Sequence, residues 1–145
     1  MFVEVKIDDE GLINWVAETE AKIFADAWSV DSIKDSLSYD YNKLVVLKDD
    51  NIVGYFISNN IAGTSELLRI AVDESLRSSG YGSKLLEKYF EVNAAEEYLL
   101  EVRATNEPAI GLYKKYGFVE IATRKNYYSN PTEDALILKR ERIND

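Results

Sequence analysis

The chain has 145 residues, 46 % of them hydrophobic, and 17 basic against 26 acidic residues give it a net charge of −9. This length predicts one domain, residues 1–145, with enough apolar surface to fold without crosslinks. The absence of cysteine and histidine excludes disulfides, thiolate or imidazole metal sites and histidine-dependent hydrolysis, so we expect no metal cofactor. A catalytic acid or base must then be a carboxylate, a tyrosine, a lysine or water.

The excess of acidic residues also indicates which partners the chain can bind. A negative surface repels phosphate backbones, so we expect no direct nucleic-acid binding, while a basic protein or an amine would be attracted. No apolar run approaches the ~18 residues of a membrane span, and the first ten residues alternate in charge rather than forming a signal peptide. We expect a soluble, cytoplasmic protein that does not bind membranes.

The first half of the chain alternates between strand and helix patterns. Residues 2–7 alternate apolar and polar side chains as a half-buried strand does, and apolar residues between 12 and 24 then recur at helical spacing. Ser29 is the expected N-cap of a short second helix, with Asp31 in its first turn and Ile33 on its apolar face. Residues 43–48, 52–61 and 66–72, separated by turn residues, predict a meander of three strands.

The second half adds a strand–helix–strand crossover. Residues 80–95 predict an amphipathic helix and 98–103 a short strand, and Pro108 begins a helix that ends at Tyr116 before Gly117. Residues 118–128 and 135–140 predict two long strands joined around 130–131. The order predicts an α/β fold, with a mixed, mostly antiparallel twisted sheet of about seven strands flanked by about four helices.

The strongest local motif is Arg77-Ser78-Ser79-Gly80-Tyr81-Gly82, between a strand and a helix. A helix N-terminus carries free amides and a partial positive charge, and glycines let a phosphate approach the backbone. The motif is no Walker A loop, because Ser83 rather than lysine follows Gly82, and no dinucleotide fingerprint, because Leu85 replaces the third glycine. From these residues alone, the glycines could equally serve only a tight turn.

Placed directly after Leu68-Arg69-Ile70-Ala71-Val72, this motif resembles the acyl-CoA-binding motif of the GNAT acetyltransferases. One branch, the ribosomal-protein-alanine N-acetyltransferases, is similar along nearly the whole chain, from Trp28-Ser29 to the last strand. The segments that carry this second resemblance are 100–106, Ala109-Ile110, Leu112-Tyr113, Gly117-Phe118, 124–128 and 133–135. The resemblance implies a GNAT-type fold and direct acetyl transfer from acetyl-CoA, as cosubstrate, to an amine.

The resemblance also implies two catalytic residues. Glu101, a carboxylate within an apolar strand, matches the family's base, although it could instead pair with Arg103, two residues on and on the same strand face. Tyr113 matches the tyrosine that protonates the departing thiolate. A tyrosine at helical spacing from Ile110 and Tyr116 is otherwise an ordinary core residue.

Binding residues follow from the same likeness. The family holds CoA through the backbone of the strand Ile70, Ala71 and Val72, through the loop residues Arg77, Ser78, Ser79, Gly80, Tyr81, Gly82 and Ser83, and through Asn106. Asn106 is also a candidate N-cap of the Pro108 helix. Trp28 and Tyr128 are the candidates for acceptor binding. The family usually has Phe-Pro-Trp-Ser where this chain has Phe24-Ala25-Asp26-Ala27-Trp28-Ser29, so the acceptor region departs from its pattern.

The acceptor implied is the N-terminal alanine of a small-subunit ribosomal protein, a basic partner that suits a charge of −9. An α-amine titrates near ~7.7–8 and a lysine near ~10.4, so a carboxylate base serves the α-amine better. Two alternatives remain. The acceptor could be a polyamine, an amino sugar or a lysine side chain, or the chain could bind CoA without turnover, against which the joint presence of Glu101 and Tyr113 argues.

Overall fold

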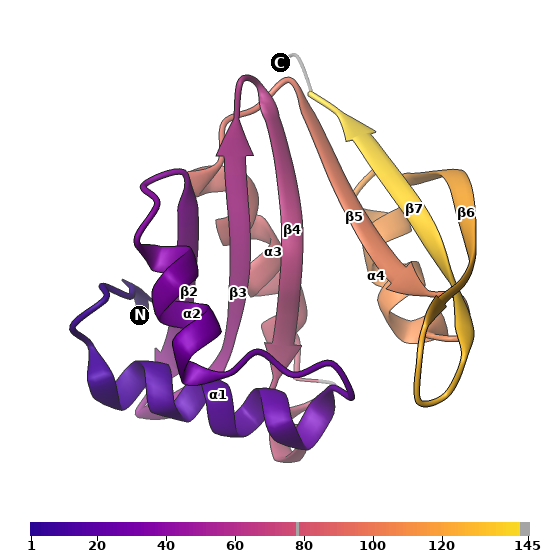
Figure 1. Cartoon of the computed structure of the whole chain (residues 1–145). Coiled ribbons are helices and arrows are strands. Elements are labelled where there is room, and N and C mark those ends of the chain that lie inside the picture. The colour runs from indigo at the N-terminus through magenta and orange to yellow at the C-terminus, as the bar shows by residue number, and fades with distance from the viewer. Residues whose placement is uncertain (78, 143–145) are drawn as a thin grey trace.

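The structure, a computed structural model, describes residues 1–77 and 79–142. Within them, seven strands form one sheet in the order β1-β2-β3-β4-β5-β7-β6 (Figure 1). The elements are β1 (Phe2–Glu4), α1 (Glu10–Ile23), α2 (Val30–Leu37), β2 (Asn42–Asp49), β3 (Asn51–Ile61), β4 (Thr64–Val72), the 3-10 turn η1 (Glu74–Leu76), α3 (Tyr81–Val92), β5 (Glu97–Arg103), α4 (Glu107–Lys115), β6 (Val119–Tyr128) and β7 (Glu133–Glu141).

All strand pairs in this sheet are antiparallel except β4 and β5, which are parallel and joined through α3. The α/β class and the mostly antiparallel sheet are therefore confirmed. The prediction of one crossover is incomplete, because β5 and β6 lie on either side of β7 and their connection through α4 is a second crossover. In the described part of the chain, no helix combines the length and the apolar character that crossing a bilayer requires.

Two hydrophobic clusters lie on opposite faces of the sheet. Ile13 and Val16 of α1 and Ile33 of α2 pack on one face, over β2, β3 and β4. Leu86 of α3 and Tyr113 of α4 belong to the cluster on the other face, which extends to β5 and β7. Full burial of an aliphatic side chain is worth about 1.5–3 kcal/mol, so these clusters fix how the helices sit on the sheet.

The predicted helix caps are confirmed. Ser29 Oγ accepts a hydrogen bond of 3.1 Å from the Ser32 amide and begins α2. Asn106 Oδ1 accepts one of 3.3 Å from the Ala109 amide and begins α4. Beyond α4, Gly117 has a φ of +93°, the left-handed conformation that commonly ends a helix.

Two predicted boundaries are wrong by a few residues. The first strand stops at Glu4 because the Lys6 amide donates to the Asp9 carboxylate at 2.8 Å, which turns the chain toward α1. Helix α3 ends at Val92 rather than residue 95. There the Asn93 side chain donates to the Tyr89 carbonyl at 3.1 Å and the backbone leaves the helical conformation.

A β-bulge interrupts β4. Arg69 lies opposite Ile57 of β3, and Leu67 lies opposite Ser58, so Leu68 is one residue more than β3 can pair. A bulge of this kind places two consecutive side chains on one face, and Leu68 and Arg69 both point toward the α1 side. Bulges also increase local strand twist.

Beyond the bulge, β4 and β5 separate. They pair only from Thr64 to Leu67 of β4, against Glu97 to Leu100 of β5, and then diverge along their remaining lengths (Figure 1). On its other side β4 stays close to β3. A Cβ atom added at Gly54 would lie 2.5 Å from the Ala71 carbonyl oxygen, so only glycine fits between the two strands there.

Candidate active site

A cleft of about 610 Å³ opens where β4 and β5 diverge. Residues 67–72 of β4 form one wall and residues 100–103 of β5 the other. The N-terminal turns of α3 and α4 border it on one side of the sheet, and the loop between α1 and α2 reaches it from the other. Because β5 does not pair with residues 68–72, the backbone polar groups on that edge of β4 can bind a ligand.

The α3 end of the cleft has the features of an anion site. Gly80 has a φ of +83°, which glycine adopts without strain, and α3 begins at the next residue, Tyr81. The first-turn amides of a helix have no partner within it, and here they belong to Tyr81, Gly82 and Ser83. Arg77 is exposed and lines the cleft together with Tyr81 and Gly82.

The other predicted loop residues are placed less directly. Ser79 is exposed within the loop, neither Ser79 nor Ser83 lines the cleft, and Ser78 lies outside the described residues. Among the remaining predicted CoA-binding residues, Ile70, Ala71, Val72 and Asn106 all line the cleft. The structure therefore brings both walls and the helix N-terminus of the predicted CoA site into one cavity.

Glu101 projects from β5 on the face opposite the α3 and α4 core, and its side chain is 31 % exposed. Its carboxylate lies 3.4 Å from Arg124 Nε on β6. The alternative ion pair with Arg103 is not formed, because Arg103 pairs with Glu133 at 3.4 Å and donates to backbone carbonyls of the β6–β7 turn. Glu101 thus remains open to the cleft beside a partly exposed arginine.

Tyr113 projects from α4 into the same cleft and is only 6 % exposed. Its ring packs edge-on against Phe118. Burial raises the pKa of the Tyr113 phenol well above its ordinary value, so the group holds its proton at neutral pH. Within the described part of the chain, its hydroxyl forms no hydrogen bond to another side chain.

Tyr128 and its neighbours form the wall next to Glu101. Burial and then the charge of Glu101 raise the pKa of Tyr128 to about 12, and the Arg103 guanidinium lies 4.4 Å above its ring. A further bulge, in β6, lies just before Tyr128, and the Asn126 amide within it donates to the Asp134 carboxylate at 2.9 Å. This irregular segment turns aromatic side chains toward the catalytic carboxylate predicted from the sequence.

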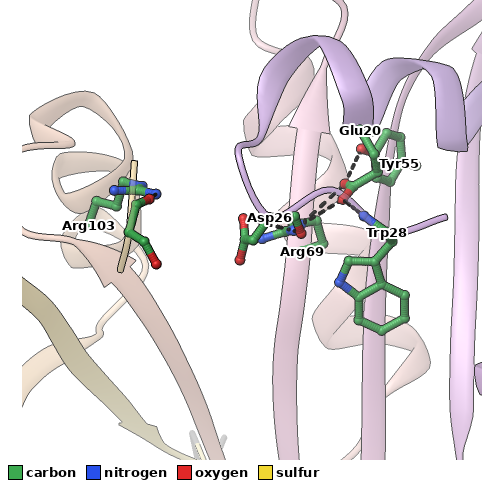
Figure 2. A network of polar contacts seen from close by, with 7 residues as sticks. Glu20, Asp26, Trp28, Tyr55, Arg69 and Arg103 are labelled. Carbon is green, nitrogen blue, oxygen red and sulfur yellow. Dashed lines mark hydrogen bonds and ion pairs between the residues drawn. The ribbon is translucent and has the colours of Figure 1, made fainter. Parts of the chain in front are cut away.

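A buried polar network fixes the α1–α2 loop on the opposite side of the cleft (Figure 2). Glu20 is 0 % exposed and accepts hydrogen bonds from the Tyr55 hydroxyl at 2.5 Å, Arg69 Nε at 3.0 Å and the Trp28 amide at 3.0 Å. Arg69 also donates to the Asp26 carbonyl at 2.8 Å and contacts its carboxylate at 3.3 Å. Arg69 on β4 therefore joins Asp26, in the middle of the loop, to Glu20 of α1, and Glu20 in turn holds the α2 end of the loop at Trp28.

Sequence reasoning missed this network, although a signal was present. Glu20 falls on the apolar stripe of α1 with Ile13, Val16 and Ile23, and Arg69 interrupts an apolar strand. A buried charge needs a partner, so an acid and a base at apolar positions predict an ion pair.

Trp28, a predicted acceptor residue, packs against the apolar cluster beneath α1 and α2 and does not line the cleft. Its part in acceptor binding stays a prediction. In residues 1–77 and 79–142, no three acidic side chains lie close enough to hold a metal ion.

Comparison with known proteins identifies the class to which this fold and cleft belong. Residues 10–118 match the model of the Acetyltransferase (GNAT) family, so the chain is a member of that family and an N-acetyltransferase by class. The family uses acetyl-CoA, in agreement with the predicted cosubstrate.

Several similar chains belong to one branch of this family, the ribosomal protein bS18-alanine N-acetyltransferases. A Bacillus subtilis protein provisionally assigned as a ribosomal protein bS18-alanine N-acetyltransferase is 36 % identical over 131 residues, 87 % of each chain. The ribosomal protein bS18-alanine N-acetyltransferase of Salmonella typhimurium is 33 % identical over 129 residues, 86 % of each chain. The crystal structure of the Escherichia coli ribosomal-protein-S18-alanine N-acetyltransferase superposes with a TM-score of 0.81 at 26 % identity, covering 97 % of this chain and 94 % of that one.

Proposed function

We propose that this chain transfers the acetyl group of acetyl-CoA to the N-terminal α-amine of a protein, namely the N-terminal alanine of a small-subunit ribosomal protein. The observation that carries the proposal is the cleft between β4 and β5. It joins an amide-rich helix N-terminus, an open strand edge, a carboxylate and a buried phenol. Relatives named for bS18 alanine acetylation support the acceptor, as does a net charge of −9, which attracts basic proteins.

The residues present fit acetyl-CoA. The pyrophosphate suits the amides of Gly82 and Ser83 at the start of α3, with Arg77 as a charged donor. The amide-bearing arm of the cosubstrate suits the unpaired edge of residues 70–72, as an added strand does. When bound, acetyl-CoA supplies an acetyl group activated as a thioester.

Glu101 is the base of the proposed mechanism. Only an unprotonated amine can attack the thioester, and its attack releases a further proton that Glu101 accepts, directly or through one water molecule. A protein α-amine titrates near ~7.7–8, so the proton is within reach of a carboxylate acting through water. The Glu101 side chain is exposed enough for the acceptor to reach it from solvent.

Tyr113 is the acid. Its phenol keeps its proton because burial raises its pKa, and its hydroxyl forms no hydrogen bond to another side chain in the described part of the chain. The thiolate that leaves when the acetyl group is transferred takes this proton and departs as the neutral thiol, and the phenolate formed on Tyr113 regains a proton from water in the cleft before the next turnover. Asn106 and the start of α4 border the same region of the cleft.

The proposal is tested by thiol release from acetyl-CoA with three acceptors. These are an unblocked alanine-terminated peptide, the same peptide with a blocked N-terminus and an internal lysine, and spermidine. We expect turnover with the free alanine terminus alone. Turnover with lysine or spermidine instead would keep the enzyme class and overturn the acceptor. Acetyl-CoA binding without thiol release from any acceptor would favour a binding module.

A further inference from the structure

The charges around the acceptor end of the cleft are not balanced. Glu101 pairs with Arg124, and Arg103 pairs with Glu133, so each of these two pairs is neutral. Arg69, in contrast, is shared between two carboxylates. Its Nε lies 3.0 Å from Glu20 and its second terminal nitrogen 3.3 Å from Asp26.

Of these two carboxylates, Glu20 interacts more closely with Arg69. Glu20 is fully buried and Arg69 Nε donates to both of its carboxylate oxygens, whereas the Asp26 side chain is 60 % exposed. The single positive charge of Arg69 therefore neutralises only one of the two carboxylates. The excess negative charge lies on Asp26, at the surface of the cleft.

Asp26 is also held in place. Arg69 donates to its backbone carbonyl at 2.8 Å, and the Arg69 guanidinium stacks 3.9 Å from the ring of Phe24. The carboxylate faces the opening between β4 and β5, with Arg103 across the gap (Figure 2). The Glu101 carboxylate is the main cause that raises the pKa of Tyr127, and burial is the main cause for Tyr128; the charge of Asp26 adds to the rise in both pKa values.

We propose that Asp26 is a specificity-determining residue that binds a cationic side chain of the acceptor within the first few residues after the acetylated amine. This inference rests on the proposed function and names the class of acceptor, a peptide with a basic residue close to its N-terminus. A carboxylate that is held at the surface of the cleft, and whose arginine partner also neutralises Glu20, attracts a cation and repels an acidic acceptor. The net negative charge of the whole chain attracts a basic acceptor at long range, whereas Asp26 contacts one cationic side chain of that acceptor.

The test uses three alanine-terminated, C-terminally amidated peptides that differ at the second residue, which is arginine, alanine or glutamate. Arginine is chosen because its guanidinium is not an acceptor amine. At saturating acetyl-CoA and low ionic strength, we expect kcat/KM to be at least tenfold higher for the arginine peptide than for the glutamate peptide. Asp26→Asn should reduce this ratio about fivefold and leave the KM for acetyl-CoA unchanged.

Asp40→Asn is the matched control, since Asp40 is exposed in the turn before β2 and does not line the cleft. It changes the net charge equally and should leave the ratio as it is. Moving the arginine to the third or fourth position shows how far from the amine the contact is made.

The outcomes separate the two proposals. Equal rates for the three peptides, or equal effects of Asp26→Asn and Asp40→Asn on the ratio, would overturn the role of Asp26 while the acetyltransferase proposal stands. Absence of turnover with all three peptides would overturn the proposed acceptor and the inference with it.

Discussion

At the scale of single residues, the two proton-handling groups differ in how much protein surrounds them. The Glu101 side chain is partly open to solvent at the edge of a strand, while Tyr113 is enclosed by α4 and the core. An exposed base can exchange its proton with water after each turnover, and an enclosed acid is kept protonated by its surroundings. Their roles predict different responses to substitution.

For Glu101→Gln we expect kcat/KM to fall about a hundredfold at neutral pH, since the base is lost and CoA binding is not. Both proteins should slow as pH falls below the α-amine pKa of ~7.7–8, and the fold loss should stay the same, because the supply of unprotonated amine falls equally for wild type and variant. A pH series of thiol release measures it. Glu97→Gln is the control on the same strand face, where Glu97 pairs with Lys139 outside the cleft. An equal loss in both variants would contradict a role for Glu101 as base.

For Tyr113→Phe we expect kcat to fall about tenfold or more, while the free energy of unfolding changes by less than about 1 kcal/mol. The small change follows because no hydrogen bond from this hydroxyl to another side chain is lost in the described part of the chain. Thiol release and urea unfolding measure the two effects. Tyr116→Phe, at the C-cap of the same helix, removes a hydroxyl that donates to Glu87, and serves as the control. A large loss of stability with an unchanged rate would favour a purely structural Tyr113.

The pH dependence adds a second test of Tyr113. Its pKa is raised by burial, so its acid form persists through the range in which an ordinary tyrosine, near ~10, loses its proton. The wild-type kcat should therefore not decline between pH 8 and 10 through deprotonation of Tyr113. Wild type and Tyr113→Phe should have pH profiles of the same shape in that interval. A decline in that interval that disappears in the variant would contradict the raised pKa.

At the scale of elements, the connection between α1 and β4 depends on one ion pair. Arg69→Met leaves the Glu20 carboxylate buried without a cation, which we expect to cost about 3–5 kcal/mol of unfolding free energy. Adding Glu20→Gln should recover part of that loss, because the unpaired charge is removed. Urea unfolding of both single variants and the double variant measures the coupling. Additive losses would show that Glu20 and Arg69 do not depend on each other.

The loop before α3 is tested with Gly80→Ala. A side chain at a φ of +83° costs roughly 1–2 kcal/mol, and the strain falls where the helix amides face the cleft. We expect the KM for acetyl-CoA to rise severalfold and the KM for peptide to stay constant. Gly11→Ala, in α1 with open space around it, should leave both constants unchanged. An unchanged KM for acetyl-CoA in Gly80→Ala would contradict an anion site at this turn.

Elements and caps were predictable from local pattern, because each depends on neighbours in the chain. Ser29, Asn106 and Gly117 end or begin helices through contacts within a few residues. The bulge at Leu68 was not predictable, since residues 66–72 have the composition of an uninterrupted strand. Only the pairing with β3 shows that one residue is extra.

The candidate site, too, could be predicted only in part from the sequence. The motif around Gly80 and the catalytic candidates could be identified from the sequence, and the structure places them around one cleft, although their roles remain predictions. The partners of the charged residues could not be identified. Glu101 and Arg103 share a strand face, yet each pairs with a residue more than twenty positions away, on β6 and β7. Long-range packing decides such pairs, and spacing along one strand does not.

At the scale of the whole molecule, the sheet consists of two parts joined along a short stretch. β1 to β4 form one part and β5 to β7 the other, and only residues 64–67 and 97–100 pair between them (Figure 1). A ligand seated along the open edge would bridge the two parts. At a hundred times its Kd, acetyl-CoA should add about 2.7 kcal/mol of stability and raise Tm by roughly 5–10 °C.

Thermal unfolding with and without acetyl-CoA measures this shift, and amide hydrogen exchange locates it. Protection should increase in residues 68–72 and at the start of α3, and change little at the β2–β3 turn. Stabilisation without added protection in β4 would place the ligand elsewhere.

The extra residue at Leu68 has a consequence for how this site tolerates change. Deletion of Leu68 would leave Leu67 and Arg69 as neighbours opposite Ser58 and Ile57, and the ordinary alternation of a strand would keep Arg69 on the Glu20 side. The strand would, however, lose the irregularity at which β5 departs. The contact between Arg69 and Glu20 therefore tolerates loss of this residue, whereas the cleft depends on it. The number of residues in β4, more than the identity of residue 68, is the property under constraint at this position.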